Sequence, residues 1–202
     1  MSTPGTILQT FWRSPHLPWL ELRSTWQSRQ AYKRHSHPQL SLGAIVEGGT
    51  RCVCDGEEYL LEPGDIIAVA PDAPHSCNPI AGRPRSYHML WLDTDWCLSQ
   101  LPELAQGGSL SCPQPVISEA RLFDRFIRLV GLIYAGDETQ AAQSVRALLR
   151  ALPLQSASPV SPGTTSQKIS ERLLTNLATP PSLDALAAEF SLRKETLIRS
   201  FK

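Results

Sequence analysis

Residues 35–49 read HSHPQLSLGAIVEGG, and this stretch decides the fold class. A pair of histidines leads into a short apolar run, residues 41–46, which ends at a glycine turn. Runs of similar length follow at residues 50–54, 58–61, 65–70 and 87–92. Asp55-Gly56 separates two of these runs and favours a two-residue type I′ hairpin. Short apolar runs at this spacing predict a mainly-β sandwich or barrel, which we assign to residues 1–112.

Histidines mark the candidate site of this domain. His35 and His37 are two residues apart, so on a strand both rings project from one face, and His75 follows a later run that could return alongside. Three converging imidazoles could bind a divalent metal ion (zinc, iron or manganese) or hydrogen-bond a small anionic or polar ligand. The aromatic residues that could line the same pocket are Tyr87 and Trp91, with Tyr59 and Trp12 as weaker candidates; ordinary core packing is the alternative for each.

Charge is distributed unevenly along the 202 residues. The 19 basic and 19 acidic residues balance, which argues against a chain coated in basic residues for nonspecific nucleic-acid binding. Residues 151–167 nevertheless carry no charge and are rich in Pro, Ser and Thr, so we predict a linker over 153–167. Residues 168–202 hold six basic and four acidic residues and form a basic tail.

Composition also bears on the cellular compartment. No apolar run approaches the roughly 18 to 20 residues of a membrane span, and the first ten residues lack the pattern of a signal peptide. The five cysteines contain no CxxC spacing, which fits a reducing compartment. We expect a soluble cytoplasmic protein without a membrane partner.

Helical periodicity begins after the β-region, and residues 113–152 contain two apolar stripes. Amphipathic helices must bury such a stripe on the domain, on each other or on a second copy of the chain. We predict a homodimer that uses the first stripe, formed by Leu122, Phe126, Leu129 and Ile133.

The histidine pattern resembles the first motif of the cupin superfamily, which consists of small jelly-roll barrels. The HxH of His35 and His37 matches that motif, and Gly48 falls in register. The position of the glutamate, a metal ligand in the family, holds Ser41, or Leu42 with the other permitted spacing. The resemblance therefore implies a barrel whose carboxylate ligand is missing.

The second cupin motif is matched in part. Gly64 and His75 occupy their places, whereas Ala70 and Asp72 replace a proline and a glycine. Three of the four metal-ligand positions are thus present, and the resemblance leaves open whether the histidines bind metal, line a ligand pocket or simply pack. Residues that could replace the carboxylate are Glu47, Gln39 and Cys77.

The tail predicts two short helices joined by a tight turn. Ser182 is a plausible N-cap for a helix over residues 183–190, and apolar spacing continues in a second helix after the turn. Basic residues on a second helix are typical of a helix-turn-helix, although many such pairs are only solvated. The candidate DNA contacts are Arg193, Lys194, Thr196, Arg199 and Lys202.

The sequence LAAEFSL, followed by LIRSFK, resembles the first helix-turn-helix of the AraC family of bacterial transcription regulators. Ser191 stands where that family usually has a turn glycine, and Arg193 where it usually has a capping serine. The residues that carry the resemblance are Ala187, Phe190, Leu197, Arg199, Phe201 and Lys202.

Together the two resemblances imply a ligand-responsive regulator: a cupin-like sensor for a small-molecule effector, a helical segment, a linker and a DNA-binding domain that reads a promoter. The alternatives are a metal-dependent cupin enzyme, such as a dioxygenase or isomerase, and a ligand-binding module without a DNA role. The tail favours the regulator, so we expect no enzymatic activity. The family continues beyond the position of Lys202, so we expect residues 1–202 alone to bind DNA poorly.

Overall fold

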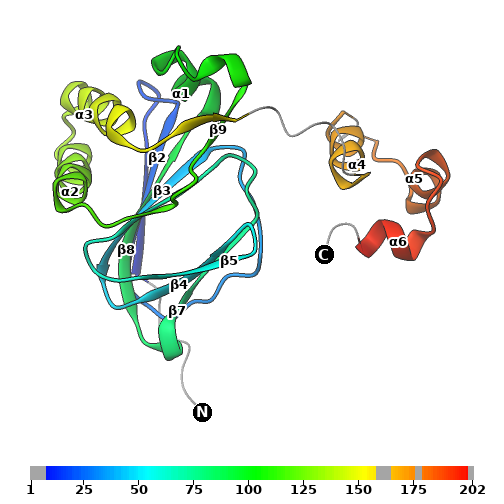
Figure 1. The fold of residues 1–202 in the computed structure, drawn as a ribbon, viewed down its shortest axis with the longest axis horizontal. Coiled ribbons are helices and arrows are strands. Elements are labelled where there is room, and N and C mark those ends of the chain that lie inside the picture. The colour runs from blue at the N-terminus through cyan, green and yellow to red at the C-terminus, as the bar shows by residue number, and fades with distance from the viewer. Residues whose placement is uncertain (1–7, 158–164, 176–178, 200–202) are drawn as a thin grey trace. The chain divides into compact units, whose positions relative to one another are not determined.

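In the computed structural model, the described residues are 8–157, 165–175 and 179–199. They belong to two compact units, Met1–Ala157 and Ser158–Lys202. The first unit is mainly β and the described part of the second is helical (Figure 1).

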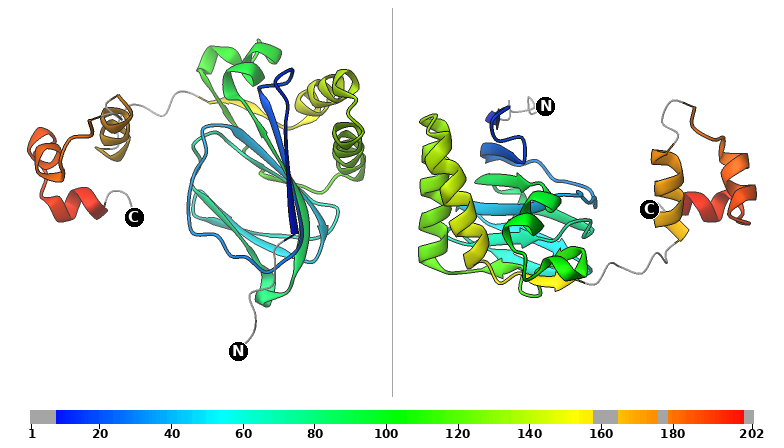
Figure 2. Two further views of the ribbon diagram at one scale, coloured as in Figure 1. Left: turned by 180° about the vertical axis from the view of Figure 1, so that it is seen from behind. Right: turned by 90° about the horizontal axis from the view of Figure 1, so that it is seen from above.

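Two antiparallel sheets face each other in the first unit (Figures 1 and 2). The larger sheet has the strand order β1 (Leu8–Arg13), β2 (Leu20–Ser28), β8 (Arg85–Leu92), β3 (Leu40–Glu47), β6 (Ile66–Val69) and β10 (Val116–Ile117). The smaller sheet has the order β5 (Glu57–Leu61), β4 (Thr50–Cys54) and β7 (His75–Pro79). The predicted mainly-β domain is confirmed.

Side-chain alternation gives the larger sheet two different faces. On β3, Leu40, Leu42 and Ala44 belong to one hydrophobic core, whereas Gly43 and Ile45 line a cavity between the sheets. The neighbouring strands repeat this period of two, which is the geometry of a pleated strand. One face is therefore built for packing and the other for enclosing a space.

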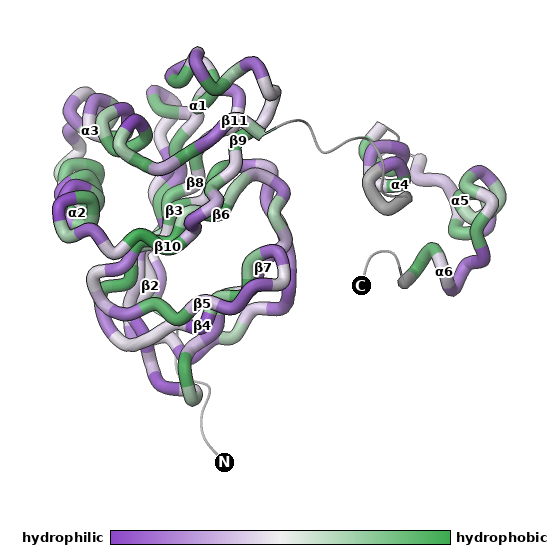
Figure 3. The backbone as a smooth tube through the Cα atoms, in the orientation of Figure 1, coloured by the Kyte–Doolittle hydropathy of each residue, from purple (hydrophilic) through white to green (hydrophobic). Residues whose placement is uncertain are grey.

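Helices cover the packing face. α2 (Ala120–Tyr134) and α3 (Glu138–Ala151) lie side by side against the larger sheet (Figure 2), and α1 (Thr94–Gln100) adds its Cys97 to the same core. Both long helices alternate hydrophobic and hydrophilic residues along the chain (Figure 3), as their amphipathic sequences require. Two one-turn helices complete this unit, η1 (Ile80–Gly82) and η2 (Ala105–Gly107).

The predicted role of the first apolar stripe is wrong. Leu122, Phe126, Leu129 and Ile133 are only 4%, 0%, 0% and 1% exposed within a single chain. They pack into the core beneath α2, because the apolar face of the larger sheet is the nearest surface that can bury them. A dimer interface cannot use side chains that a single chain already removes from solvent.

Two turns follow directly from their sequences. Asp55 and Gly56 join β4 to β5 with φ angles of 50° and 91°, as the predicted type I′ hairpin requires. Gly48 follows β3 with φ +71°, and a Cβ atom placed there would lie 2.4 Å from the carbonyl oxygen of Pro84. Only glycine fits this turn.

The predicted linker is shorter in the structure. Gln155–Ala157 forms β11, which pairs with β9 (Ser109–Ser111) because that strand offers free backbone hydrogen-bonding groups. At the other end, α4 (Thr165–Leu174) begins before residue 168. Backbone pairing and helix formation therefore extend into a segment whose composition alone favours irregular chain.

The second unit contains α4, α5 (Leu183–Glu189) and α6 (Lys194–Arg199). Ile169 of α4, Leu186 and Ala187 of α5 and Leu197 of α6 are buried together. Ser182 caps α5 as predicted, because its hydroxyl accepts the N–H of Ala185 at 3.1 Å. Sequence analysis missed α4, although Ile169 and Leu173 show its helical spacing.

The turn between α5 and α6 takes a left-handed residue. Ser191 has φ 53°, and its N–H donates to the carbonyl oxygen of Ala188 at 3.2 Å. The N–H of Leu192 donates to the carbonyl oxygen of Ala187 at 2.9 Å. This pair of bonds is a Schellman motif, whose left-handed position is usually glycine. Ser191 therefore holds a left-handed conformation that is strained for a residue with a Cβ atom.

Within the described ranges, every helix is too short or too polar to cross a bilayer.

Candidate functional site

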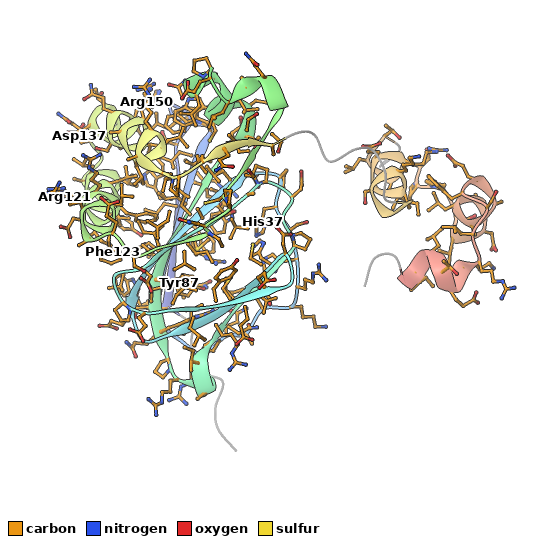
Figure 4. All side chains as sticks on the ribbon, viewed as in Figure 1. His37, Tyr87, Arg121, Phe123, Asp137 and Arg150 are labelled. Atoms are coloured by element: carbon orange, nitrogen blue, oxygen red, sulfur yellow. The ribbon has the colours of Figure 1, made fainter. Side chains whose placement is uncertain are left out.

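The candidate site is a cavity of about 430 Å³ between the two sheets of the first unit. Its volume falls within the usual range of small-molecule sites, about 300 to 1,000 Å³. Tyr87, labelled in Figure 4, lies in the interior of this barrel. The lining residues that carry the chemistry are Arg23, Tyr32, His35, His37, Thr50, His75, Cys77, Arg85, Tyr87 and Trp91.

The structure brings the three predicted histidines together. The ring centroids of His35 and His75 lie 4.5 Å apart, and the ring of His37 lies 4.8 Å from the first and 5.4 Å from the second. His35 and His37 do not lie on a strand as predicted, because β3 begins only at Leu40. An isolated backbone bridge between His35 and His75, the first residue of β7, fixes the chain here instead.

Hydrogen bonds orient two of these rings. The Nδ1 atom of His35 lies 2.7 Å from the carbonyl oxygen of Lys33, and that of His75 lies 2.9 Å from the carbonyl oxygen of Ala73. A carbonyl oxygen can only accept, so each Nδ1 carries the hydrogen and each Nε2 keeps a free lone pair. Such second contacts are typical of metal-binding histidines.

Burial keeps the imidazoles neutral. Removal from water, together with the neighbouring His35, His75 and Arg23, lowers the pKa of His37 to about 4. Removal from water also lowers the pKa of His75. At neutral pH both rings are uncharged and can act as ligands or as hydrogen-bonding groups.

The donor set fits a metal ion in part. One nitrogen from each of the three histidines can be chosen so that all lie within 4.8 Å of one another, whereas the ligands of a tetrahedral zinc ion lie about 3.4 Å apart. Small side-chain rotations would close this difference. Ser41, at the place of the family's glutamate, is 1% exposed and supplies no carboxylate. Among the described residues that line the cavity, none is Asp or Glu.

Arg23 of β2 is a cavity residue that sequence analysis missed. Its guanidinium carbon lies 5.0 Å from the ring centroid of Trp91, 5.6 Å from that of Tyr32 and 5.8 Å from that of Tyr87. Its Nε atom is buried and has no hydrogen-bond partner in the described part of the chain. Its place between Leu22 and Ser24 could have indicated this role. Both neighbours face the packing side of the sheet, so alternation along the strand points Arg23 to the cavity side.

Arg85 of β8 is the second missed cation and is only 1% exposed. It donates to the hydroxyl of Thr50 at 3.1 Å and to the carbonyl oxygens of Cys77 and Gln30 at 2.8 and 3.4 Å. All three acceptors are neutral. Its guanidinium carbon lies 5.0 Å from the ring centroid of Tyr87.

The aromatic predictions divide into two groups. Tyr87 and Trp91 line the cavity, and the hydroxyl of Tyr87 lies 3.1 Å from that of Tyr32. Tyr59 and Trp12 do not line it: Tyr59 packs beside the buried residues of the smaller sheet, and Trp12 packs on the core beneath the helices. Both therefore have the core role that was the alternative.

The described DNA-contact candidates lie at the start of α6. Arg193, Lys194 and Thr196 are exposed. The ammonium of Lys194 pairs with the carboxylate of Asp184 on α5, an exposed ion pair of small energetic value. The side chain of Arg199 and the whole of Lys202 lie outside the described residues.

Comparisons with known proteins agree with this architecture. A family model described as an AraC-like ligand binding domain matches residues 19–157. A curated relative, the uncharacterized HTH-type transcriptional regulator YbfI of Bacillus subtilis, is 30% identical over 94 residues, which are 46% of this chain and 33% of the relative. This chain thus matches about a third of the length of that regulator.

Solved structures show weaker similarity. A cupin superfamily protein from Desulfitobacterium hafniense is 13% identical with a TM-score of 0.39, over 46% of this chain and 82% of that protein. The manganese-containing oxalate decarboxylase of Bacillus subtilis is 16% identical with a TM-score of 0.37, over 43% and 25% of the two chains. Similarity at this level supports no inference about activity.

Proposed function

Because this chain belongs to the AraC-like ligand binding domain family, we propose that it acts as a ligand-responsive transcription regulator. A small molecule binds in the barrel cavity, and the second unit contributes to the reading of promoter DNA. The observation that carries the proposal is the cavity of about 430 Å³, with convergent polar side chains, in the matched part of the chain. Relatedness to an HTH-type regulator supports the same role.

The DNA-binding step belongs to α5 and α6. A helix pair with a tight turn and exposed Arg193, Lys194 and Thr196 suits entry of α6 into the major groove. Arg199 and Lys202 follow them in the sequence and belong to the same proposed set of DNA contacts. The ion pair between Lys194 and Asp184 is exposed, so a phosphate can replace the carboxylate at little cost.

Ligand and DNA binding are linked if the ligand prefers one arrangement of the protein over another. Coupling of this kind typically changes affinity about 5-fold or more. A homodimer remains part of the proposal, and its interface uses residues other than the buried stripe of α2.

The test is a fluorescence-anisotropy titration of DNA from the region upstream of the gene, using the protein as the gene encodes it. Metabolites are first compared by the shift that each causes in the melting temperature of the protein. The metabolite with the largest shift is then added to one arm of the titration. We expect a change in Kd of about 5-fold or more, and loss of DNA binding in Thr196→Ala/Arg193→Ala. Equal affinity with and without a ligand that binds the cavity would contradict the proposal.

The second candidate function, a metal-dependent enzyme, rests on the cluster of three imidazoles. His35, His37 and His75 would hold the ion, which would supply Lewis-acid or redox chemistry when bound. The chain's own groups in the same cavity include Tyr32 and Tyr87, which can orient a ligand by hydrogen bonds. Turnover of a substrate by metal-loaded protein, lost in His37→Asn, would establish this function instead.

A further inference from the structure

The cavity holds cationic donors without an anion to balance them. We propose that the molecule it binds is an organic carboxylate with an apolar body, and that Arg23 is the residue that anchors the carboxylate. The inference rests on the proposed sensor function of the cavity and adds the chemical class of the ligand.

Arg23 is placed to receive an anion. The rings of Tyr32, Tyr87 and Trp91 surround its guanidinium at 5.0 to 5.8 Å and hold the charge by cation–π attraction. Neither a hydrogen bond nor an ion pair joins it to any residue in the described ranges, and its Nε atom is buried without a partner. The guanidinium therefore has no counter-charge among the described residues, and a bound carboxylate would supply one.

Arg85 adds a second positive charge beside the same ring. Its guanidinium carbon is 5.0 Å from the Tyr87 centroid, compared with 5.8 Å for that of Arg23. Its partners are neutral oxygens, and its Nε atom is also buried without a partner among the described residues. Arg23 and Arg85 line the cavity together with the exposed Lys33 and Arg34, and the described lining contains no carboxylate. The cavity therefore has a positive field, in which an anion is the complementary ligand.

Trp91 contributes a third donor. Its indole Nε1 is buried and lacks a partner within the described part of the chain, and an indole nitrogen can only donate. Its ring is also the closest of the three to Arg23. The Trp91 ring and the Arg23 guanidinium are therefore neighbouring parts of the cavity wall.

The remaining wall defines the body of the ligand. The apolar side chains that line the cavity are Ile45, Ile67, Val69 and Met89, and those of Met89 and Ile67 pack closely over Gly43. The described lining contains no Asp, Glu, Asn or Gln, so a polyol would find few acceptors for its hydroxyl hydrogens. An aliphatic or aromatic body matches this wall better than a sugar does.

The test compares carboxylates with their primary amides, because each pair has nearly the same shape and differs in charge. The probes are benzoate, 3-phenylpropanoate and octanoate, each beside its amide, titrated into the full chain by calorimetry. We expect a carboxylate to bind about 10-fold or more tightly than its amide, as charge-assisted hydrogen bonds predict.

Variants locate the anion. Arg23→Met keeps the unbranched stem and should abolish the preference for the carboxylate, whereas Arg23→Lys should restore part of it. The matched control is Arg51→Met, because Arg51 is exposed on β4 and pairs with Glu58 at 3.5 Å. Thermal unfolding of each variant shows whether it remains folded.

Three outcomes would overturn the inference. Equal binding of carboxylates and amides contradicts the ligand class, and unchanged carboxylate binding in Arg23→Met contradicts the anchor. Binding of sugars or other neutral probes alone also contradicts the ligand class, but it leaves the proposed sensor function intact. If none of the probes binds and neutral metabolites do not bind either, both the inference and the sensor function fail.

Discussion

His35 and His75 exchange both of their backbone hydrogen bonds, at 3.0 and 2.8 Å, although strands β3 to β6 lie between them in the sequence. This bridge brings their rings within 4.5 Å of each other. The segment before β3 is thereby tied to the first residue of β7. One backbone contact thus assembles the histidine cluster from two distant segments.

We expect the cluster of His35, His37 and His75 to bind a metal ion, and we expect this binding to depend on His37. The metal-free chain should bind one equivalent of Co²⁺ with a visible absorption spectrum, because three imidazole ligands leave open coordination positions. His37→Asn should remove this spectrum. His16→Asn is the matched control, since His16 is exposed and lies outside the cavity. A spectrum that survives His37→Asn would show that the cobalt binds elsewhere.

Acid should destabilise the metal-free protein. Burial lowers the pKa of His88 and of His75, and the pKa of His37 falls to about 4. The unfolded chain, with histidine pKa values near 6.5, therefore takes up protons first as the pH falls. The free energy of unfolding should decrease from pH 7 toward pH 4, as measured by urea denaturation. A free energy of unfolding that stays constant between pH 7 and pH 4 would contradict this account. So would a pH dependence in His88→Gln as steep as that of the unchanged protein.

Phe126 should govern stability rather than association. Its side chain is 0% exposed beneath α2, so Phe126→Ala should lower the free energy of unfolding by about 3 to 5 kcal/mol. Arg128→Ala, on the exposed face of the same helix, should change it by less than about 0.5 kcal/mol. Thermal unfolding and light scattering together check this. The interface role of Phe126 would be restored by one result. The wild-type protein would have to be a dimer, and Phe126→Ala a folded monomer with an unchanged free energy of unfolding.

Ser191 should be improved by glycine. Its φ of 53° is costly for a residue with a Cβ atom, so Ser191→Gly should stabilise the turn by about 1 kcal/mol. Hydrogen exchange at the Leu192 amide, which donates to Ala187, should slow about fivefold. Ser191→Ala keeps the strain and should show no gain. Equal hydrogen-exchange rates at the Leu192 amide in Ser191→Gly and Ser191→Ala would show that backbone strain at residue 191 does not limit the stability of the turn.

Cys52 and Cys77 should oxidise together. They are direct cross-strand partners on β4 and β7, and their Sγ atoms lie 2.6 Å apart. The hydrogen bond between the two thiols and the nearby Arg85 lower the pKa of Cys77, which favours the reactive thiolate. Diamide should take up both thiol hydrogens and leave a disulfide between these residues, identified by peptide mass. Cys97→Ser should not affect the reaction, whereas a Cys52 thiol that still titrates fully would contradict the prediction.

Local patterns in the sequence determined much of the fold. The apolar runs, the Asp55-Gly56 hairpin, the two amphipathic helices and the Ser182 cap were predictable, because each depends on residues close together in the chain. The HxH motif and the sequence of the tail indicated the family, because they too consist of residues close together in the chain. Five of the cavity residues, His35, His37, His75, Tyr87 and Trp91, were therefore predictable from the sequence.

The tertiary structure alone decided what each surface packs against and which charges face the cavity. The stripe of Phe126 could equally have met a second chain, since periodicity defines an apolar face and not its partner. Arg23 and Arg85 look like ordinary strand residues in sequence, because nothing local shows that their neighbours across the sheets are aromatic and neutral. Burial without a counter-charge is a property of packing between distant segments, so the site's positive character emerges only when the two sheets are brought together.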